Sequence, residues 1–408
     1  MTAPKLRFKE FDGDWNTSKI DEIASVTSGG TPSRGNPEYW NGDIPWVTTS
    51  LVDFNVIHSA EEFITKEGVN NSSAKLFPKD TILMAMYGQG ITRGKVAILG
   101  IEATTNQACC AIKLKDYFDT QFIFQNLMNR YDEIRDLSND GGQKNLSAGI
   151  IKDISINIPS KAEQTKIASF LSAVDEKISQ LTQKHELLSQ YKQGMMQKLF
   201  SQQIRFKADD GSEFGEWETK TLGEICSRHY QGINTVADKI EYQKEGYPIL
   251  QAKHITSEKL DFEDVRFISK SDFQKYRDKY IPQLNDILFS NIGTIGKVVL
   301  VNEAIPFFIA WNIFLLSLKN NTAVPMYLTA FLRWLTSLNY FDNLQTGNAT
   351  KFINKTDLLD TKINLPCLEE QTKIANFLSA IDQKIEVVAQ QIEQAKTWKK
   401  GLLQQMFV

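Results

Sequence analysis

The sequence predicts an α+β protein in which two similar tandem domains and two long paired helices form a pseudo-two-fold arrangement. Three observations lead to this prediction. The chain, at 408 residues, is too long for one compact core. A segment of about forty residues occurs twice, and each half carries short β-branched and aromatic runs separated by turns. The composition, with 42% hydrophobic residues and 24 phenylalanines, supplies enough apolar surface for two cores.

The repeated segment is the strongest signal in the chain. Residues 162–200 align without a gap with residues 369–407, so that Glu163 corresponds to Glu370 at an offset of 207 residues. About half of the aligned positions are identical, and most others are conservative, such as Tyr191 against Trp398. The chain therefore consists of two related units.

Apolar residues recur in both copies at steps of three and four, which is typical of a coiled-coil seam. His185 and Lys192 fill two seam positions, and we interpret them as polar residues that fix the register rather than as a pH switch. At 1.5 Å per residue each helix would span roughly 55–60 Å, so we expect the two helices to pack on each other as a rigid spacer. Two unrelated core helices are the alternative. The predicted seam consists of Ile167, Leu171, Val174, Ile178 and Leu181 in the first helix and Ile374, Leu378, Ile381, Ile385 and Val388 in the second.

The segments that precede the helices also correspond. Arg-Phe-Lys occurs at 7–9 and at 205–207, and SINIPS at 155–160 matches KINLPC at 362–367. The middles of the two halves differ strongly, which suggests one scaffold that serves two different targets. We expect domains over residues 1–160 and 202–367, and helices over 161–201 and 368–408.

Within each domain the sequence predicts a mixed α+β fold. Expected strands include 44–51, 81–88, 95–100 and 108–114, and one helix is expected in each half, over 120–137 and 325–344. A glycine-containing polar loop follows each helix, at 139–148 and 345–354. Glycine permits close backbone approach, and Gln, Lys and Asn can donate to phosphates or base edges. A helix C-cap followed by a surface loop is an equally simple interpretation of either loop alone.

Three further segments combine glycine with a basic residue. The loops at 87–95 and 290–297 resemble a phosphate-binding loop only superficially, because the glycine spacing differs and Val follows the Lys, so no nucleotide site is predicted. They are either plain strand connections or loops that place basic residues against a nucleic-acid backbone. GGTPSR at 29–34 is either an exposed turn or a segment whose Arg pairs with guanine and whose Thr and Ser bind phosphates.

Other classes of function receive little support. The four cysteines form no CxxC pair, and the four histidines lack metal-ligand spacing, so neither a disulfide framework nor a metal site is expected. No apolar run suggests a signal peptide or a membrane span, and we expect a soluble cytoplasmic protein. The formal net charge of −3 argues mildly against DNA binding by the chain alone, although partners could contribute basic surface.

With EQTKIA and FLSA in both helices and GGTPSR followed by IPW in the first half, the chain resembles the DNA-specificity subunits of Type I restriction-modification enzymes over nearly its whole length. The resemblance implies two target-recognition domains, each reading one half of a split, asymmetric double-stranded DNA site. It also implies that the two helices form an antiparallel spacer whose length sets the gap. The implied partners are two modification subunits and the restriction subunits, with no membrane. S-adenosylmethionine, ATP and Mg²⁺ would belong to those partners, which carry out adenine methylation and cleavage, and this chain would have no catalytic residue and no cofactor.

Two rival functions are an enzyme that acts on DNA and a protein scaffold. A nuclease or methyltransferase would require a carboxylate cluster or a cofactor loop, and the sequence contains neither. A coiled-coil scaffold that assembles proteins without binding DNA remains the alternative, and it should show no salt-dependent binding to a duplex.

The candidate DNA contacts come from the loops described above. In the first half they are Thr31, Ser33, Arg34, Trp46, Thr48, Gln89, Arg93, Lys95, Gln143 and Lys144. In the second half, SRHYQGIN at 227–234 stands in the place of GGTPSR, which makes the contacts there harder to predict. The candidates are Arg228, Tyr230, Gln231, Asn234, Lys253, Asn291, Lys297, Asn348 and Lys351.

Overall fold

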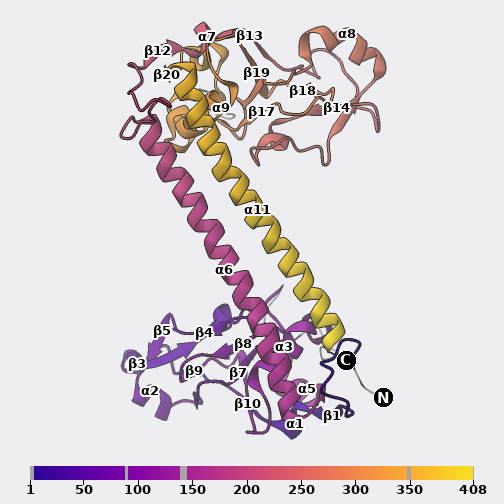
Figure 1. The fold of residues 1–408 in the computed structure, drawn as a ribbon. Coiled ribbons are helices and arrows are strands. Elements are labelled where there is room, and N and C mark those ends of the chain that lie inside the picture. Colours follow the sequence, from indigo (N-terminus) through magenta and orange to yellow (C-terminus); the bar gives the residue numbers. More distant parts are fainter. Residues whose placement is uncertain (1–3, 88–90, 138–144, 347–350, 408) are drawn as a thin grey trace. The chain divides into compact units, whose positions relative to one another are not determined.

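The structure is a computed structural model that describes residues 4–87, 91–137, 145–346 and 351–407, without the side chain of Lys279. The chain divides into two compact units, one of residues 1–183 together with 389–408 and the other of residues 184–388. Each unit holds one α+β domain and a part of both long helices (Figure 1). The predicted fold class, two tandem α+β domains with two long helices, is confirmed.

The first domain contains two sheets. The larger has the order β2 (Ala24–Ser28), β10 (Cys109–Leu114), β7 (Ile82–Ala85), β8 (Val96–Leu99) and β4 (Val56–Ile57). The smaller has the order β5 (Glu62–Ile64), β3 (Trp40–Val47), β9 (Ala103–Thr105) and β6 (Leu76–Phe77). A separate antiparallel pair joins β1 (Asn16–Lys19) to β11 (Ser155–Ile158), directly before the long helix.

The helical segments of this domain are short. They are α1 (Ile20–Ile23), η1 (Pro37–Tyr39), η2 (Thr49–Leu51), α2 (Lys66–Asn70), α3 (Thr120–Asn129), α4 (Tyr131–Asp136) and α5 (Ala148–Asp153). The single helix expected over 120–137 is thus two helices, which meet at Arg130, where the backbone leaves helical geometry (φ −96°, ψ 19°). The strand expected over 44–51 ends at Val47, because residues 49–51 form a 3₁₀ turn.

The larger sheet is buried on both faces. Ile82 and Met84 point into a core shared with α3, while Leu83 and Ala85 point into a second core beneath the smaller sheet. This division follows from the alternation of side chains along a strand. It explains why β7 and β8 are apolar throughout, with all their residues buried.

The second domain repeats this plan. Its sheets have the orders β13 (Cys226–Gln231), β19 (Ile313–Leu318), β16 (Ile287–Ser290), β17 (Val298–Leu300), and β15 (Arg266–Ile268), β14 (Tyr247–Leu250), β18 (Phe308–Ile309). The pair β12 (Glu218–Thr221) with β20 (Lys362–Leu365) corresponds to β1 with β11. The helical segments are α7 (Leu222–Ile225), η3 (Ala252–Ile255), α8 (Lys270–Tyr280), α9 (Pro325–Ser337), η4 (Tyr340–Leu344) and α10 (Lys355–Leu359). The helix expected over 325–344 ends at Ser337, and Asn339 follows in the left-handed region (φ 56°).

The two long helices are α6 (Lys161–Phe200) and α11 (Leu368–Met406). In the first unit the beginning of α6, at Ile167 and Leu171, shares a core with the end of α11, at Leu402 and Met406. In the second unit the end of α6 shares a core with the beginning of α11. The helices therefore pack antiparallel within each unit, as the resemblance implied. All ten predicted seam residues lie on the buried or half-buried side of their helix.

Two ion pairs accompany this packing. Lys399 Nζ lies 2.5 Å from Asp175 Oδ1 in the first unit, and Lys192 Nζ lies 2.6 Å from Asp382 Oδ1 in the second. The two pairs are equivalent, because each residue of one is 207 positions from its counterpart in the other. Both lysines are largely covered, with 17% and 16% of their side chains exposed, so each seam lysine reaches an aspartate on the opposite helix.

The repeated Glu-Gln pair at the start of each long helix locks the domain to the helix. Glu163 is buried and accepts two bonds of 2.7 Å from the Arg7 guanidinium, and Glu370 is likewise held by Arg205 at 3.1 and 2.7 Å. The neighbouring Gln164 accepts a bond of 2.9 Å from the Asp119 amide at the start of α3 and donates to the Pro159 carbonyl. Gln371 repeats both bonds, with the Val324 amide and the Pro366 carbonyl.

Candidate nucleic-acid interface

GGTPSR begins where the chain leaves the larger sheet and crosses to the smaller one. The Gly29 amide donates to the Cys109 carbonyl at 3.2 Å, and the Gly30 amide donates to the Thr105 carbonyl at 2.8 Å. A Cβ on either glycine would overlap backbone atoms of the strands and turns that it crosses. These glycines are therefore required by the crossing itself.

Arg34 is held in place by an acid and two indoles. Its guanidinium forms a two-pronged ion pair with Glu62, and the Nη2 to Oε1 distance is 3.0 Å. The same guanidinium lies 3.7 Å from the centre of the Trp40 ring and 5.0 Å from that of Trp46. The hydrogen bond between Arg34 and Glu62 lowers the pKa of the Glu62 carboxyl group and raises the pKa of the Arg34 guanidinium. Because 56% of its side chain is exposed, Arg34 is both fixed and accessible.

The other predicted residues of this region occupy different environments. Trp46 is buried, with 3% of its surface exposed, and its indole donates to the Gly30 carbonyl at 2.9 Å, so it supports Arg34 from beneath. The Thr31 hydroxyl donates to the Gln107 amide oxygen. Ser33 is exposed, and the Thr48 hydroxyl lies 2.6 Å from that of Ser50 at the start of η2.

Arg93 and Lys95 lie in a second group, at the start of β8. Lys95 pairs with Asp53 at 2.5 Å, and only 14% of its side chain is exposed. Arg93 donates to the Arg135 carbonyl in α4 at 3.2 Å. Gly94 between them has a φ of +85°, a conformation that favours glycine. Gln89, Gln143 and Lys144 lie outside the described residues.

The two loops that recur in the sequence come together in each domain. In the first domain the Leu146 amide donates to the Met86 carbonyl at 3.0 Å. In the second, the Ile353 amide donates to the Asn291 carbonyl at the same distance. Gly296 (φ +81°) precedes Lys297 as Gly94 precedes Lys95. The sequence singled out both loops but not their contact.

In the second domain these loops carry three of the predicted contacts within the described residues. Asn291 is buried, with 1% of its surface exposed, and its amide reaches the Ile353 carbonyl at 3.5 Å. Lys297 is half-buried and Lys351 is exposed. Asn348 lies outside the described residues.

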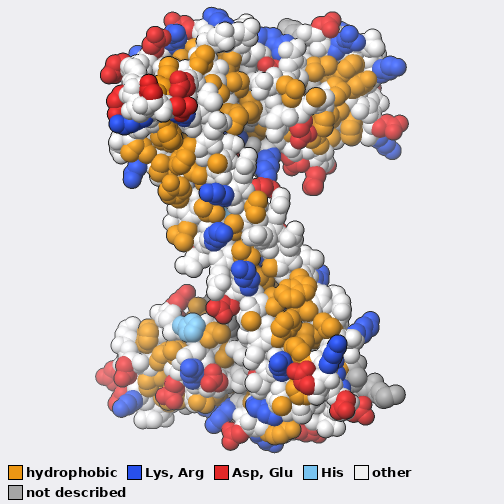
Figure 2. Space-filling model, in the orientation of Figure 1, with side chains coloured by type: hydrophobic (Ala, Val, Ile, Leu, Met, Phe, Trp, Pro, Cys, Tyr) orange, Lys and Arg blue, Asp and Glu red, His pale blue; other side chains and the backbone are white. Residues whose placement is uncertain are grey.

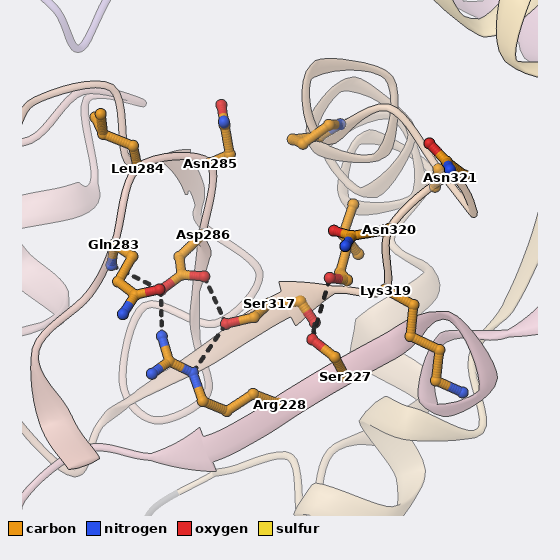
Figure 3. A pocket seen from close by; sticks show the side chains of 13 residues that line it. Ser227, Arg228, Gln283, Leu284, Asn285, Asp286, Ser317, Lys319, Asn320 and Asn321 are labelled. Atoms are coloured by element: carbon orange, nitrogen blue, oxygen red, sulfur yellow. Dashed lines mark hydrogen bonds and ion pairs between the residues drawn. The ribbon is translucent and has the colours of Figure 1, made fainter. Parts of the chain in front are cut away.

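Arg228, Tyr230 and Gln231 follow one another along β13. Arg228 donates to Asp286 at 2.9 Å and to Ser317 at 3.1 Å, and Ser317 in turn donates to Asp286 (Figure 3). The hydroxyl of Tyr230 is buried and burial raises its pKa, while the ring packs edge-on against Tyr280 at 5.4 Å.

Arg228, Asp286 and Ser317 border a polar hollow of about 580 Å³, which Figure 3 shows from close by. Its basic groups are already engaged, because Arg228 is paired with Asp286 and Lys319 donates to the Glu224 carbonyl at 2.6 Å. The hollow therefore offers amide and hydroxyl groups rather than a free positive charge. The remaining polar side chains that line it are Ser227, Gln283, Asn285, Asn320 and Asn321.

The remaining predicted contacts of the second domain lie at the end of β13 and farther along the chain. The Gln231 side chain donates to the Trp311 carbonyl, and the Asn234 side chain accepts from the Ala237 amide at 3.1 Å. Lys253, on η3, pairs with Asp264 at 2.8 Å. The DNA contacts stay predictions in both domains.

Sequence reasoning missed the acids that hold the predicted cations. Glu62, Asp53 and Asp286 orient Arg34, Lys95 and Arg228, yet no motif or periodicity marks them. Acidic and basic side chains are interspersed on the visible face of both units (Figure 2), which agrees with the net charge of −3. Within the described ranges, no three His, Cys, Asp or Glu residues are grouped as a metal site would require. None of the helices in those ranges is long and apolar enough to span a bilayer.

Comparison with known proteins agrees with the repeat. The Type I restriction modification DNA specificity domain matches residues 12–190 and again residues 215–397. The Type I restriction enzyme MjaIX specificity subunit of Methanocaldococcus jannaschii is 30% identical over 323 residues, which cover 74% of this chain and 73% of that protein. The MjaVIII specificity subunit of the same organism is 24% identical over 415 residues, 97% of this chain and 94% of the relative.

Solved structures show the same fold. The S subunit of a Type I restriction-modification system from M. genitalium aligns with a TM-score of 0.60 and 17% identity, covering 100% of this chain and 99% of that one. The HsdS subunit from Thermoanaerobacter tengcongensis aligns with a TM-score of 0.52 and 17% identity, covering 97% of both chains. The chain belongs to the Type I restriction-modification DNA specificity family, and it carries the family's domain twice.

Proposed function

We propose that this chain is the specificity subunit of a Type I restriction-modification complex and that each of its domains reads one half of an asymmetric, two-part site in double-stranded DNA. The observation that carries the proposal is that the specificity domain occurs twice on the same scaffold. In both copies an Arg–Glu ion pair and a Gln side chain attach the domain to a long helix through the same hydrogen bonds. The residues displayed beyond that frame differ, for example Arg34 on its indoles in one copy and Arg228 beside Asp286 in the other. A scaffold that presents two different surfaces suits a DNA site whose two halves differ in sequence.

The long helices would set the gap between the half-sites. In the antiparallel alignment Lys192 meets Asp382 and Lys399 meets Asp175. In a parallel alignment at the offset of 207 residues, lysine would face lysine and aspartate would face aspartate. The charges therefore favour one orientation and one register, as a spacer of fixed length requires.

The chemistry would lie in the partners. Two modification subunits would supply S-adenosylmethionine and methylate adenine, and restriction subunits would supply the ATP- and Mg²⁺-dependent cleavage. This chain would contribute no catalytic residue and no cofactor. The candidate contacts Arg34, Lys95, Arg228 and Lys253 are each paired with an acidic side chain, so we expect tight DNA binding to need the basic surface of those partners.

Binding by the assembled complex tests the proposal. The complex with its modification subunits should bind a duplex that carries its site, and the affinity should fall steeply as salt rises from 50 to 200 mM, by roughly 10³-fold for about six phosphate contacts. Arg34→Ala should weaken binding or relax one position of the site by about 1–3 kcal/mol. A complex that forms but binds no duplex at any salt concentration would favour a protein scaffold without a DNA function.

A further inference from the structure

One loop occupies the same place in both domains. It joins β9 to β10 in the first domain, through residues 106–108, and β18 to β19 in the second, through residues 310–312. Four backbone hydrogen bonds of the first domain recur in the second at equivalent atoms. They are Gly30 N to Thr105 O, Asn106 N to Val47 O, Cys109 N to Asn106 O and Met86 N to Ala108 O, matched by Ile233 N to Ile309 O, Ala310 N to Leu250 O, Ile313 N to Ala310 O and Asn291 N to Asn312 O.

These bonds make the central residues of the two loops equivalent, namely Gln107 and Trp311. Ala310, directly before Trp311, is 3% exposed, and Ile313, two residues after it, is 0% exposed, yet Trp311 itself is 48% exposed. Gln107 is exposed as well. The same backbone arrangement thus presents a polar side chain, Gln107, in the first domain and a large apolar one, Trp311, in the second.

Both side chains adjoin predicted DNA contacts. The Thr31 hydroxyl donates to the Gln107 amide oxygen. The Gln231 side chain donates to the Trp311 carbonyl, and the Trp311 amide donates to the Ile233 carbonyl at 2.9 Å, so the backbone that carries the indole is fixed. Tryptophan is enriched at binding interfaces, because its large apolar ring also carries a polar N–H group.

We propose that residue 107 and residue 311 are equivalent base-contacting positions that make the two domains read different half-sites. Gln107 reads a base edge by hydrogen bonds, for which adenine N6 and N7 are the best match to a glutamine amide. Trp311 makes an apolar contact with a base face or a thymine methyl group. The inference rests on the proposed function, because it presupposes that the domains read DNA.

The test is to co-express the chain with its modification subunit in a host without DNA methylation and to sequence the genome for methylated adenines. Gln107→Ala should relax one half of the motif, and Trp311→Ala should relax the other half. Discrimination should fall roughly 5- to 150-fold at the affected position, the equivalent of one lost base contact. Trp311→Phe should keep the apolar contact and most of the discrimination. Leu338→Ala is the matched control, since Leu338 is also 48% exposed in the same domain and should leave the motif unchanged.

Failure of the proposed function and failure of the assignment of Gln107 and Trp311 give different results. A wild-type complex that methylates nothing would contradict the proposed function itself. A wild-type complex with a split motif, whose Gln107→Ala and Trp311→Ala variants keep that motif, would overturn this inference alone. Variants that both relax the same half would overturn the inference and also contradict the assignment of one half-site to each domain. If Trp311→Ala abolishes methylation, the purified complex decides, by its affinity for duplexes scrambled in one half-site. Lost discrimination at one half supports the assignment, and unchanged discrimination at both halves refutes it.

Discussion

Replacing Arg7 with Met should destabilise the first unit strongly, although Arg7 lies near the start of the chain. Both prongs of its guanidinium reach Glu163 at 2.7 Å, and 2% of the Glu163 side chain is exposed. The variant leaves a buried carboxylate without its counter-charge, which costs about 3–5 kcal/mol in comparable buried pairs. Adding Glu163→Gln should restore part of the loss, because the uncompensated charge disappears.

The assay is urea unfolding followed by far-ultraviolet circular dichroism, with each variant compared at the midpoint of its transition. Lys19→Met is the matched control, since its ion pair with Asp153 has 54% and 72% of the side chains exposed and should leave the midpoint unchanged. Arg205→Met should repeat the effect in the second unit, through Glu370. If Arg7→Met lowers the midpoint no more than Lys19→Met does, the repeated Glu is not the lock that its geometry indicates.

Three further predictions concern the helices, the thiols and Arg34. Lys192→Asp should lower the melting temperature by placing two carboxylates together, and Asp382→Lys added to it should restore the loss; a double variant no more stable than the single one would contradict the register argument. Burial raises the pKa of the thiols of Cys109, Cys110 and Cys226 to about 12, so a thiol reagent at pH 8 should label these three only on unfolding. Cys367 is exposed and should be labelled quickly, and mass spectrometry of the labelled peptides would show the difference. The pKa of Glu62 lies below its ordinary value of 4.5, so its pair with Arg34 stabilises the fold above that pH and is lost as the pH falls through the lowered pKa; carbon-detected NMR titration should show the shift, and Arg34→Met should abolish it.

Much of the scaffold can be predicted because its segments are repeated in the sequence. The offset of 207 residues and the three- and four-residue apolar steps identify both long helices and their buried side. The Glu-Gln pair is conspicuous in the repeat, but its role is not, because Arg7 and Glu163 are 156 positions apart and meet only through the fold. A local pattern cannot reveal a partner at that separation.

The candidate site is harder to predict, because its residues also depend on partners that are distant in the sequence. Two predicted contacts, Trp46 and Asn291, are buried in the structure, and the sequence offered no means to tell a supporting indole from a displayed one. The equivalence of Gln107 and Trp311 depends on backbone bonds between strands that the sequence alone does not align. The variable middles follow one topology, yet too few of their residues match for the sequence to show it.

The methylated motif of the wild-type complex tests the division of the site between the two domains most directly. It is obtained by expressing this chain with its modification subunit in a methylation-free host and sequencing the genome. We expect one asymmetric motif with two unlike halves and a constant gap, and exchange of residues 202–367 for the corresponding domain of another specificity subunit should replace one half only. A single uninterrupted motif, or an exchange that changes both halves together, would contradict the claim that each domain reads its own half-site.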